Sequence, residues 1–331
     1  MLSERTLKSI LEDPAIAEIA PDAIKKWDLP NEEYYNWTLK KIADDMGWRK
    51  LESGFSRLFE LASRGQYYYK LYSDEECRKD PDKEGVNIVY FPSDDKEAGN
   101  RPFIFLVPGG GFVNVWNLTE GWPIATIFNN LGYNVFILTY RVQVEATAVC
   151  AMEDMSKAFE CIKTNRNKFH GDPDRYITCG FSAGGYLICL WNTEKGYSAY
   201  GINKPEACIP VYPVTSYRLM NEQDEDWYDG DKDSFARSGV GCTMEEACNS
   251  CFEIPLHVEG FPATAIFVSD KDELVNPRHS KNLAASLEKA GIPCRLEVGP
   301  DGGHGFAEGT GMCMEGWPER AIRWIEKTVI S

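Results

Sequence analysis

One short segment constrains the fold of this chain more than any other. Residues 180–185 read GFSAGG, with a strand-like stretch at 175–179 before them and an apolar, helix-like stretch at 186–191 after them. A G-x-S-x-G pattern between a strand and a helix is typical of a nucleophile elbow, a sharp turn that exposes a serine hydroxyl. Glycines flank the serine there because the strand and the helix pass too closely for a Cβ atom. The flanking pattern therefore predicts that Ser182 is a nucleophile.

A serine nucleophile needs a histidine base, and on an elbow of this kind the histidine follows last, after the acid. The chain has four histidines. His304 lies in a glycine-rich loop after a strand-like stretch at 294–298. Such a loop can present an imidazole over a neighbouring strand end. An isolated loop histidine is usually solvated, but Ser182 favours His304 as the base. We interpret the other three as structural or solvated: His170, His257 and His279.

The acid is expected at the end of the preceding strand, in the loop that follows a buried-strand pattern at 265–268. Three carboxylates compete in this loop. Asp272 is preferred, because a D-x-apolar-V-x-P loop that leads into a helix recurs in hydrolases of this type. We interpret Asp270 as a loop ligand or a solvated charge, and Glu273 is expected to face water.

Three consecutive glycines follow an apolar strand pattern at 102–107. The tetrahedral intermediate of acyl transfer needs two converging backbone N–H groups, and removing one donor typically costs about 10²–10³-fold in rate. Glycines can turn such amides inward without side chains in the way. We therefore predict an oxyanion hole formed by Gly110, Gly111 and Ala183, the last of which directly follows the nucleophile.

With these motifs together, the chain resembles the α/β-hydrolase esterases of the acetyl-xylan-esterase-like type. The resemblance covers about residues 86–328 and rests on PGGGF at 108–112, Glu120 with Gly121, residues 132–141, GFSAGG at 180–185 and GGHGF at 302–306. It implies ester hydrolysis through an acyl-enzyme, without a cofactor, with carbohydrate acetyl or acyl esters as common substrates. Two features depart from the family: Tyr186 stands where histidine is frequent, and the first 85 residues match no pattern that we recognise.

Several side chains flank these motifs and are candidates for substrate contacts. Aromatic rings suit stacking on sugar faces, although an aromatic residue beside an elbow helix belongs to the core at least as often. The predicted substrate-binding residues are Trp116, Glu120 and Tyr186, and the further candidates are Asn114, Trp122 and Tyr212.

Two other functions remain open at this point. Serine peptidases and arylformamidases use the same order of catalytic residues, and a binding protein could use an inactive hydrolase fold. The complete set of serine, aspartate, histidine and glycine loop favours an active enzyme, and the absence of a propeller-like domain favours an esterase over an oligopeptidase.

The net charge of −16 argues against nucleic acids and anionic membranes as partners. The catalytic motifs and the resemblance imply a small ester substrate, including an acylated oligosaccharide, and an oligomer is possible but not indicated by the sequence. The first residues carry charges where a signal peptide has an apolar core, and no stretch reaches the length of a membrane span.

Eleven cysteines, an odd number, indicate reduced thiols and a cytoplasmic protein. Three of the cysteines, Cys242, Cys248 and Cys251, have a spacing that zinc sites use. No second pair of ligands with such a spacing accompanies them, so no metal is predicted there.

Hydrophobic periodicity predicts an N-terminal helical extension over 1–65 and an α/β-hydrolase catalytic domain over 66–331, with a mostly parallel sheet covered by helices on both faces. Helices are expected at 3–12, 31–46, 50–63, 158–169 and 278–290. Strands are expected at 67–72, 86–91, 103–107, 134–139, 175–179, 207–211, 264–268 and 294–298, with an acidic turn at 73–85.

Residues 214–256 interrupt this alternation and are predicted to form a cap-like insertion that carries Trp227 and Tyr228. The N-terminal extension is rich in aromatic residues, more than isolated helices can keep in water. We expect the extension and the insertion to form one wall of the pocket. The aromatic residues of the extension are Trp27, Tyr34, Tyr35, Trp37 and Trp48.

Overall fold

The computed structural model describes residues 1–17, 19, 32–65, 67–223 and 231–330. A single eight-stranded sheet with the order β1-β2-β4-β3-β5-β6-β7-β8 forms its centre. Strand β2 runs antiparallel to its neighbours β1 and β4, and every other pair is parallel. All eight predicted strands occur, with ends within two residues of the prediction. They are β1 Tyr68–Lys70, β2 Asn87–Phe91, β3 Phe103–Val107, β4 Val135–Thr139, β5 Tyr176–Phe181, β6 Ala207–Val211, β7 Ala263–Ser269 and β8 Cys294–Gly299.

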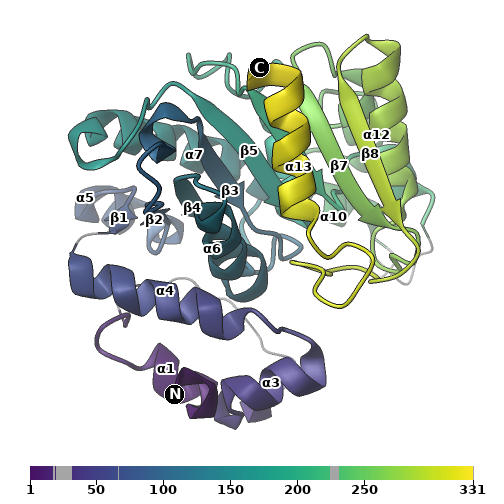
Figure 1. The fold of residues 1–331 in the computed structure, drawn as a ribbon. Helices are drawn as coiled ribbons and strands as arrows, with labels where there is room; N and C mark the ends of the chain where they lie inside the picture. Colours follow the sequence, from purple (N-terminus) through teal and green to yellow (C-terminus); the bar gives the residue numbers. More distant parts are fainter. Residues whose placement is uncertain (18, 20–31, 66, 224–230, 331) are drawn as a thin grey trace.

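Helices cover both faces of the sheet, as Figure 1 shows. Helices α6 (Trp122–Asn130) and α13 (Trp317–Ile325) pack on one face. Helices α7 (Thr147–Thr164), α8 (Ser182–Trp191) and α12 (Arg278–Lys289) pack on the other. Alternate residues of each central strand enter the two hydrophobic clusters because successive side chains of a strand point to opposite faces. The α/β-hydrolase architecture predicted from the sequence is therefore present.

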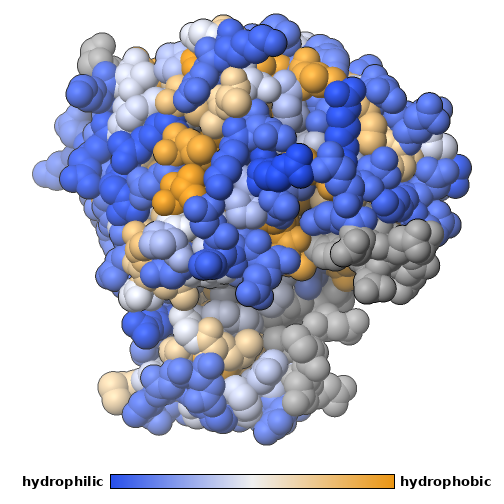
Figure 2. Space-filling view, turned by 90° about the vertical axis from the view of Figure 1, so that its right-hand side faces the viewer, coloured by the Kyte–Doolittle hydropathy of each residue, from blue (hydrophilic) through white to orange (hydrophobic). Residues whose placement is uncertain are grey.

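The N-terminal segment packs beneath α6 and forms the smaller lower lobe of the molecule (Figures 1 and 2). Its α4 approaches α6 so closely that a Cβ on Gly54 would lie 3.0 Å from the backbone nitrogen of Pro123. Apolar side chains of the segment, among them Leu7, Ile42 and Phe55, are fully buried in the same cluster as α6. The described elements are η1 Leu2–Glu4, α1 Leu7–Leu11, η2 Glu32–Asn36, α3 Leu39–Met46 and α4 Leu51–Arg64.

Three sequence predictions for helices need correction. The helix expected at 3–12 is limited to α1, because the Thr6 side chain accepts the N–H of Ser9 and starts the helix there. The helix expected at 31–46 starts at Leu39 for the same reason, with Thr38 as its cap. Helix α7 begins eleven residues before the predicted stretch at 158–169 and ends at Thr164. Two residues of the prediction, Trp27 and Asn31, lie outside the described residues.

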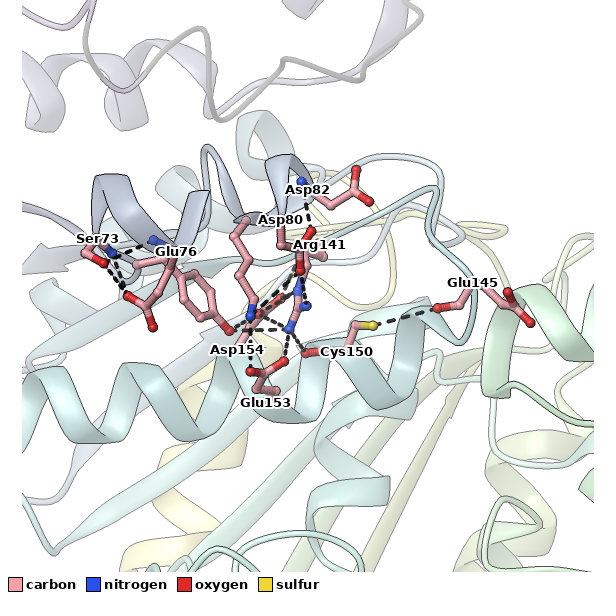
Figure 3. A network of polar contacts seen from close by, with 11 residues as sticks. Ser73, Glu76, Asp80, Asp82, Arg141, Glu145, Cys150, Glu153 and Asp154 are labelled. Atoms are coloured by element: carbon pink, nitrogen blue, oxygen red, sulfur yellow. Dashed lines mark hydrogen bonds and ion pairs between the residues drawn. The ribbon is translucent and has the colours of Figure 1, made fainter. Parts of the chain in front are cut away.

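The acidic segment at 73–85 is not a simple turn. It forms α5 (Asp74–Lys79), where Ser73 and Glu76 make a reciprocal capping box, and the short η3 (Pro81–Lys83). A polar network beside it, partly buried, joins Arg141, two residues after β4, to α7 (Figure 3). There the carboxylate of Asp154 accepts the Tyr72 hydroxyl at 2.7 Å and the backbone N–H of Arg141 at 2.8 Å.

The predicted insertion lies between β6 and β7 and consists of short helices: α9 Tyr217–Asn221, α10 Lys232–Val240, α11 Met244–Cys248 and η8 Ile254–Leu256. Trp227 and Tyr228 lie outside the described residues. The remaining short elements are η4 Ala98–Asn100, η5 Asn117–Gly121, η6 Arg166–Lys168 and η9 Glu326–Ile330. No described helix has the length and apolar character that crossing a membrane requires. The face with α12 and β8 is mostly hydrophilic (Figure 2).

Candidate active site

Ser182 occupies a strained turn between β5 and α8. Its φ of 49° lies in the left-handed region, which non-glycine residues adopt at a cost. The flanking glycines are sterically required: a Cβ on Gly180 would lie 2.5 Å from the carbonyl oxygen of Gly184. A Cβ on Gly184 would lie 2.1 Å from the carbonyl oxygen of Val107 in β3. This local structure is the one that the GFSAGG pattern predicts, and it is held by close contact between neighbouring elements.

Three residues far apart in the sequence meet above this turn. His304 Nε2 lies 2.9 Å from Ser182 Oγ, and His304 Nδ1 lies 2.7 Å from Asp272 Oδ2. The buried Asp272 uses its second oxygen, Oδ1, to accept the backbone N–H groups of Leu274 at 3.1 Å and Val275 at 2.8 Å. The carboxylate is thus fixed by its own loop and presents one oxygen to the imidazole. This arrangement can transfer a proton between the hydroxyl and the imidazole.

The competing acids lie elsewhere. Asp270 is exposed and pairs with Lys281 at 2.7 Å, and Glu273 is exposed as expected. Among the other histidines, His279 is fully buried, and its Nδ1 accepts the N–H groups of Thr215 and Ser216. Burial lowers the pKa of His279 to about 3.

The remaining two histidines lie at the surface. His257 is partly exposed beside Glu194, and His170 is exposed. Neither belongs to the site, in agreement with the sequence interpretation.

The glycine loop after β3 lies directly against the elbow. Gly110 and Gly111 have φ values of 130° and 61°, conformations that suit glycine. Together with Ala183, they line the cavity beside Ser182. The first glycine, Gly109, faces away: its N–H donates to Glu120 Oε2 at 2.7 Å. The backbone of the predicted oxyanion hole is therefore placed next to the candidate nucleophile.

A cavity of about 760 Å³ opens over Ser182 and His304. The N-terminal segment contributes Trp48 to its lining, and the insertion contributes several residues of and around α9 and α10. Both segments therefore border the cavity, and their forming one common wall stays a prediction. Most of the lining is apolar or aromatic. Beyond the residues already named, the lining includes Phe112, Val113, Trp116, Thr119, Gln143, Tyr186, Val214, Tyr217, Met220, Phe235, Ser238, Gly239, Leu274 and Val275.

The three predicted substrate-binding residues differ in their surroundings. Trp116 borders the cavity and packs edge-on against Trp48, with ring centroids 5.5 Å apart. Tyr186 borders it with its ring, while its hydroxyl donates to the carbonyl of Phe252. Glu120 reaches the cavity wall, but both of its oxygens already accept hydrogen bonds from protein groups.

Of the further candidates, Trp122 is buried against Phe55, and neither it nor Asn114 is among the residues that line this cavity. The sequence did not identify Gln143, Tyr217, Phe235 or Leu274 as site residues. Their only sequence signal was position: Tyr217 and Phe235 belong to the predicted insertion, and Leu274 lies in the predicted acid loop.

The cysteines are all free thiols, and Cys248 and Cys251 are buried. Across the described ranges, no cluster of three or more histidine, cysteine or acidic residues is arranged to hold a metal ion.

The sequence is similar to those of several known proteins. Residues 88–287, more than half of the chain, match the family model described as BD-FAE. The endo-1,4-beta-xylanase B of Butyrivibrio fibrisolvens is 24% identical over 241 residues, which cover 70% of this chain and 36% of that protein. The acetylxylan esterase of Xylanibacter ruminicola is 26% identical over 62% of this chain and 41% of its own length. The chain therefore spans about two fifths of the length of these relatives.

Solved structures share the fold. The acetyl ester-xyloside bifunctional hydrolase of Caldicellulosiruptor lactoaceticus superposes with a TM-score of 0.63 at 22% identity, covering 78% of this chain and 95% of that one. The thermophilic esterase Est2 of Thermogutta terrifontis gives a TM-score of 0.57 at 21% identity, covering 73% of this chain and 87% of that one. At this level of identity the likeness extends to the fold.

Proposed function

The chain belongs to the BD-FAE family, and from this membership we propose that it is a serine carboxylesterase that removes small acyl groups, acetyl first among them, from carbohydrate esters. The observation that carries the proposal is the hydrogen-bonded series Ser182, His304 and Asp272 at the base of a cavity. A strained serine next to an imidazole, which is itself held by a buried carboxylate, is the arrangement that acyl transfer requires.

In this mechanism the Ser182 hydroxyl attacks the ester carbonyl carbon while His304 Nε2 accepts its proton. Asp272 keeps the proton of Nδ1 in place and stabilises the imidazolium that forms. The oxyanion accepts hydrogen bonds from the backbone N–H groups of Ala183, Gly110 and Gly111. The C–O bond then breaks, and the alcohol leaves with the proton from His304. Water repeats the sequence on the acyl-enzyme and releases the acid, so no cofactor is required.

The choice of substrate rests on two supports. The named relatives include an acetylxylan esterase and a xylanase, and the fold relatives include an acetyl ester-xyloside hydrolase. The cavity wall carries several aromatic rings, including Trp48, Trp116 and Tyr186, which suit stacking on sugar rings. A small-molecule ester, including an acylated oligosaccharide, is thus the proposed partner.

We propose that the chain consists of an extension and a catalytic domain. Residues 1–65 form a helical extension, and 66–331 form the catalytic domain with the insertion at 214–256. The free thiols support a reducing compartment such as the cytoplasm.

The test is a hydrolysis panel on the full chain with p-nitrophenyl acetate, butyrate and octanoate, acetylated xylo-oligosaccharides, an N-formyl arylamine and an aminoacyl amide. We expect turnover of the acetyl esters and release of acetate from the oligosaccharides. Ser182→Ala should reduce acetyl-ester turnover by on the order of 10⁴-fold or more, because the covalent route is lost. Preference for the formyl arylamine or the aminoacyl amide would replace the proposal with arylformamidase or peptidase activity. Equal rates in wild type and Ser182→Ala would exclude the proposed nucleophile.

A further inference from the structure

A second buried carboxylate lies behind the candidate active site. Glu120 belongs to η5, a single π-helical turn immediately before α6, and its side chain is only 6% exposed. Turns of this kind occur frequently at functional sites. Burial raises the pKa of Glu120, while the hydrogen bonds from Gly109 and Tyr212 favour the ionised form. A carboxylate in such a place costs stability unless its oxygens are satisfied, so its partners indicate its role.

The first partner is the glycine loop. Glu120 Oε2 accepts the N–H of Gly109 at 2.7 Å, and the Gly109 carbonyl accepts the N–H of Trp116 at 3.0 Å. Both polar backbone groups of Gly109, its N–H and its carbonyl, are thus hydrogen-bonded. A Cβ on Gly109 would lie 2.9 Å from Glu120 Oε2 and 2.9 Å from Ser182 Cβ. The carboxylate therefore binds the glycine loop at the point where it packs tightly against the elbow, directly before Gly110 and Gly111.

The second partner leads to the histidine loop. Glu120 Oε1 accepts the hydroxyl of Tyr212 at 2.9 Å, and that hydroxyl oxygen accepts the N–H of Ala307 at 3.3 Å. Ala307 lies three residues after His304 in the same loop. The Tyr212 ring also contacts the imidazole directly, with a centroid separation of 4.8 Å. One carboxylate thus links the glycine loop to the loop that carries the base.

We propose that Glu120 is a positioning residue that sets the oxyanion loop and the His304 loop in mutual register through Gly109 and Tyr212. This inference rests on the proposed serine-esterase function. It reassigns Glu120 from the substrate contact expected from the sequence, because both carboxylate oxygens already bind protein donors. Small displacements matter here, since a shift of about 1 Å in a reacting group can cost on the order of 10²-fold in rate.

The substitution Glu120→Gln keeps the size of the side chain but leaves one acceptor oxygen for two donors, Gly109 N–H and Tyr212 O–H. Tyr212→Phe removes only the hydroxyl that joins Glu120 to Ala307. The structure also offers a matched control pair outside the site. Asp154 accepts a tyrosine hydroxyl and a backbone N–H in the same way, in the network of Figure 3. The controls are therefore Asp154→Asn and Tyr72→Phe.

The experiment measures two rates for each full-length variant: turnover of p-nitrophenyl acetate, and labelling of Ser182 by a fluorophosphonate, which reports the reactivity of the serine whatever the natural substrate is. We expect Glu120→Gln to lower kcat and the maximal labelling rate by roughly 10- to 100-fold, with KM and the probe's half-saturation constant within about twofold of wild type. Tyr212→Phe should lower both rates by a smaller factor. The double variant should lose less than the product of the single losses, because the two residues act through one link.

The controls should lower the melting temperature and leave both rates per folded molecule unchanged. If Asp154→Asn does not fold, the two rates of Tyr72→Phe are compared with those of Tyr212→Phe. Unchanged rates in Glu120→Gln, a change confined to KM, or equal losses in the control pair would overturn the inference. Failure of the esterase proposal looks different: wild type would not turn over esters, while the labelling rates would still rank the variants.

Discussion

At the scale of single residues, backbone strain is concentrated around the candidate site. Six non-glycine residues in the described ranges have positive φ values, and three of them, Phe112, Gln143 and Ser182, line the cavity. Two more, Tyr212 and Ala307, belong to the link between Glu120 and the histidine loop. Strained residues persist only where surrounding contacts overdetermine them, and they cluster at functional sites. Their distribution supports the proposed site independently of the Ser182, His304 and Asp272 contacts.

A residue-scale prediction separates the two aspartates of the acid loop. Asp272→Asn should lower kcat for p-nitrophenyl acetate by up to about 10⁴-fold, because the imidazole loses its charge partner and its fixed tautomer. Asp270→Asn removes only an exposed pair with Lys281, and we expect kcat within about twofold of wild type. Steady-state kinetics of both variants with equal folded fractions provides the measurement. The reverse ranking would place the acid two residues earlier.

At the scale of elements, the start of α12 is joined to the beginning of the insertion by a buried histidine. His279 Nδ1 lies 3.1 Å from the backbone nitrogen of Thr215 and 3.2 Å from that of Ser216, and both N–H groups donate to it. A neutral imidazole can accept these bonds, but an imidazolium cannot. Burial of the ring lowers its pKa to about 3, and the positive charge of Arg278 adds to this effect.

This junction predicts an acid-labile element. Between pH 6.5 and about 3 the unfolded chain binds a proton at His279 that the folded chain excludes, so stability is complete above pH 6.5 and falls as the pH decreases. The contribution lost between pH 7 and pH 5 is about 2 kcal/mol. We expect His279→Asn, whose amide oxygen can accept the same bonds, to remove this part of the pH dependence of the unfolding free energy.

Urea unfolding of wild type and variant at the two pH values measures the effect. His257→Asn is the control, since that ring is partly exposed beside Glu194, and it should keep the wild-type pH dependence. An identical pH dependence in wild type and His279→Asn would contradict the assignment.

At the scale of the whole molecule, the N-terminal segment is part of the body that builds the cavity. Its buried side chains share a cluster with α6 and the sheet. Trp48, which lies in the chain between α3 and α4, lines the cavity. Residues next to Trp48 also meet the histidine loop: a Cβ on Gly311 would lie 2.9 Å from the Arg49 guanidinium. The extension predicted from the sequence is thus continuous with the catalytic domain in packing.

This arrangement predicts a role for the extension in selectivity. Trp48→Ala should enlarge the cavity and raise the ratio of octanoate to acetate hydrolysis roughly tenfold, because the edge-on contact with Trp116 no longer closes that side. Trp37→Ala is the matched control: Trp37 packs on Tyr34 and Lys41 in the same segment and is not among the residues that line the cavity. It should lower the melting temperature and leave the ratio unchanged. An unchanged ratio in Trp48→Ala would make the extension a scaffold without influence on acyl length.

Much of this protein could be predicted from the sequence because its determinants are local. The elbow needs glycine at 180 and 184 for steric reasons that a short motif records, and the strands between the two edges of the sheet are apolar stretches whose burial on both faces leaves a clear pattern. The same holds for His304 and Asp272, each of which is marked by its own loop. The helix expected at 50–63 matches α4 within one residue at each end, whereas the two helices expected before it start too early. Those starts, and the helix found where a turn was expected, depend on single capping side chains: Thr6, Thr38 and Ser73.

Contacts between segments that are distant in the sequence become visible only in the folded chain. Only folding brings Trp48 to Trp116, and only folding shows that the two oxygens of Glu120 accept hydrogen bonds from Gly109 and Tyr212, the contacts on which the proposed positioning role rests. The elbow, the chain order of the catalytic candidates and the strands of a mostly parallel sheet were predictable from the sequence alone. The cavity wall and the buried link could not be predicted in this way, because their contacts join residues as far as 95 positions apart and leave no periodic or local signal.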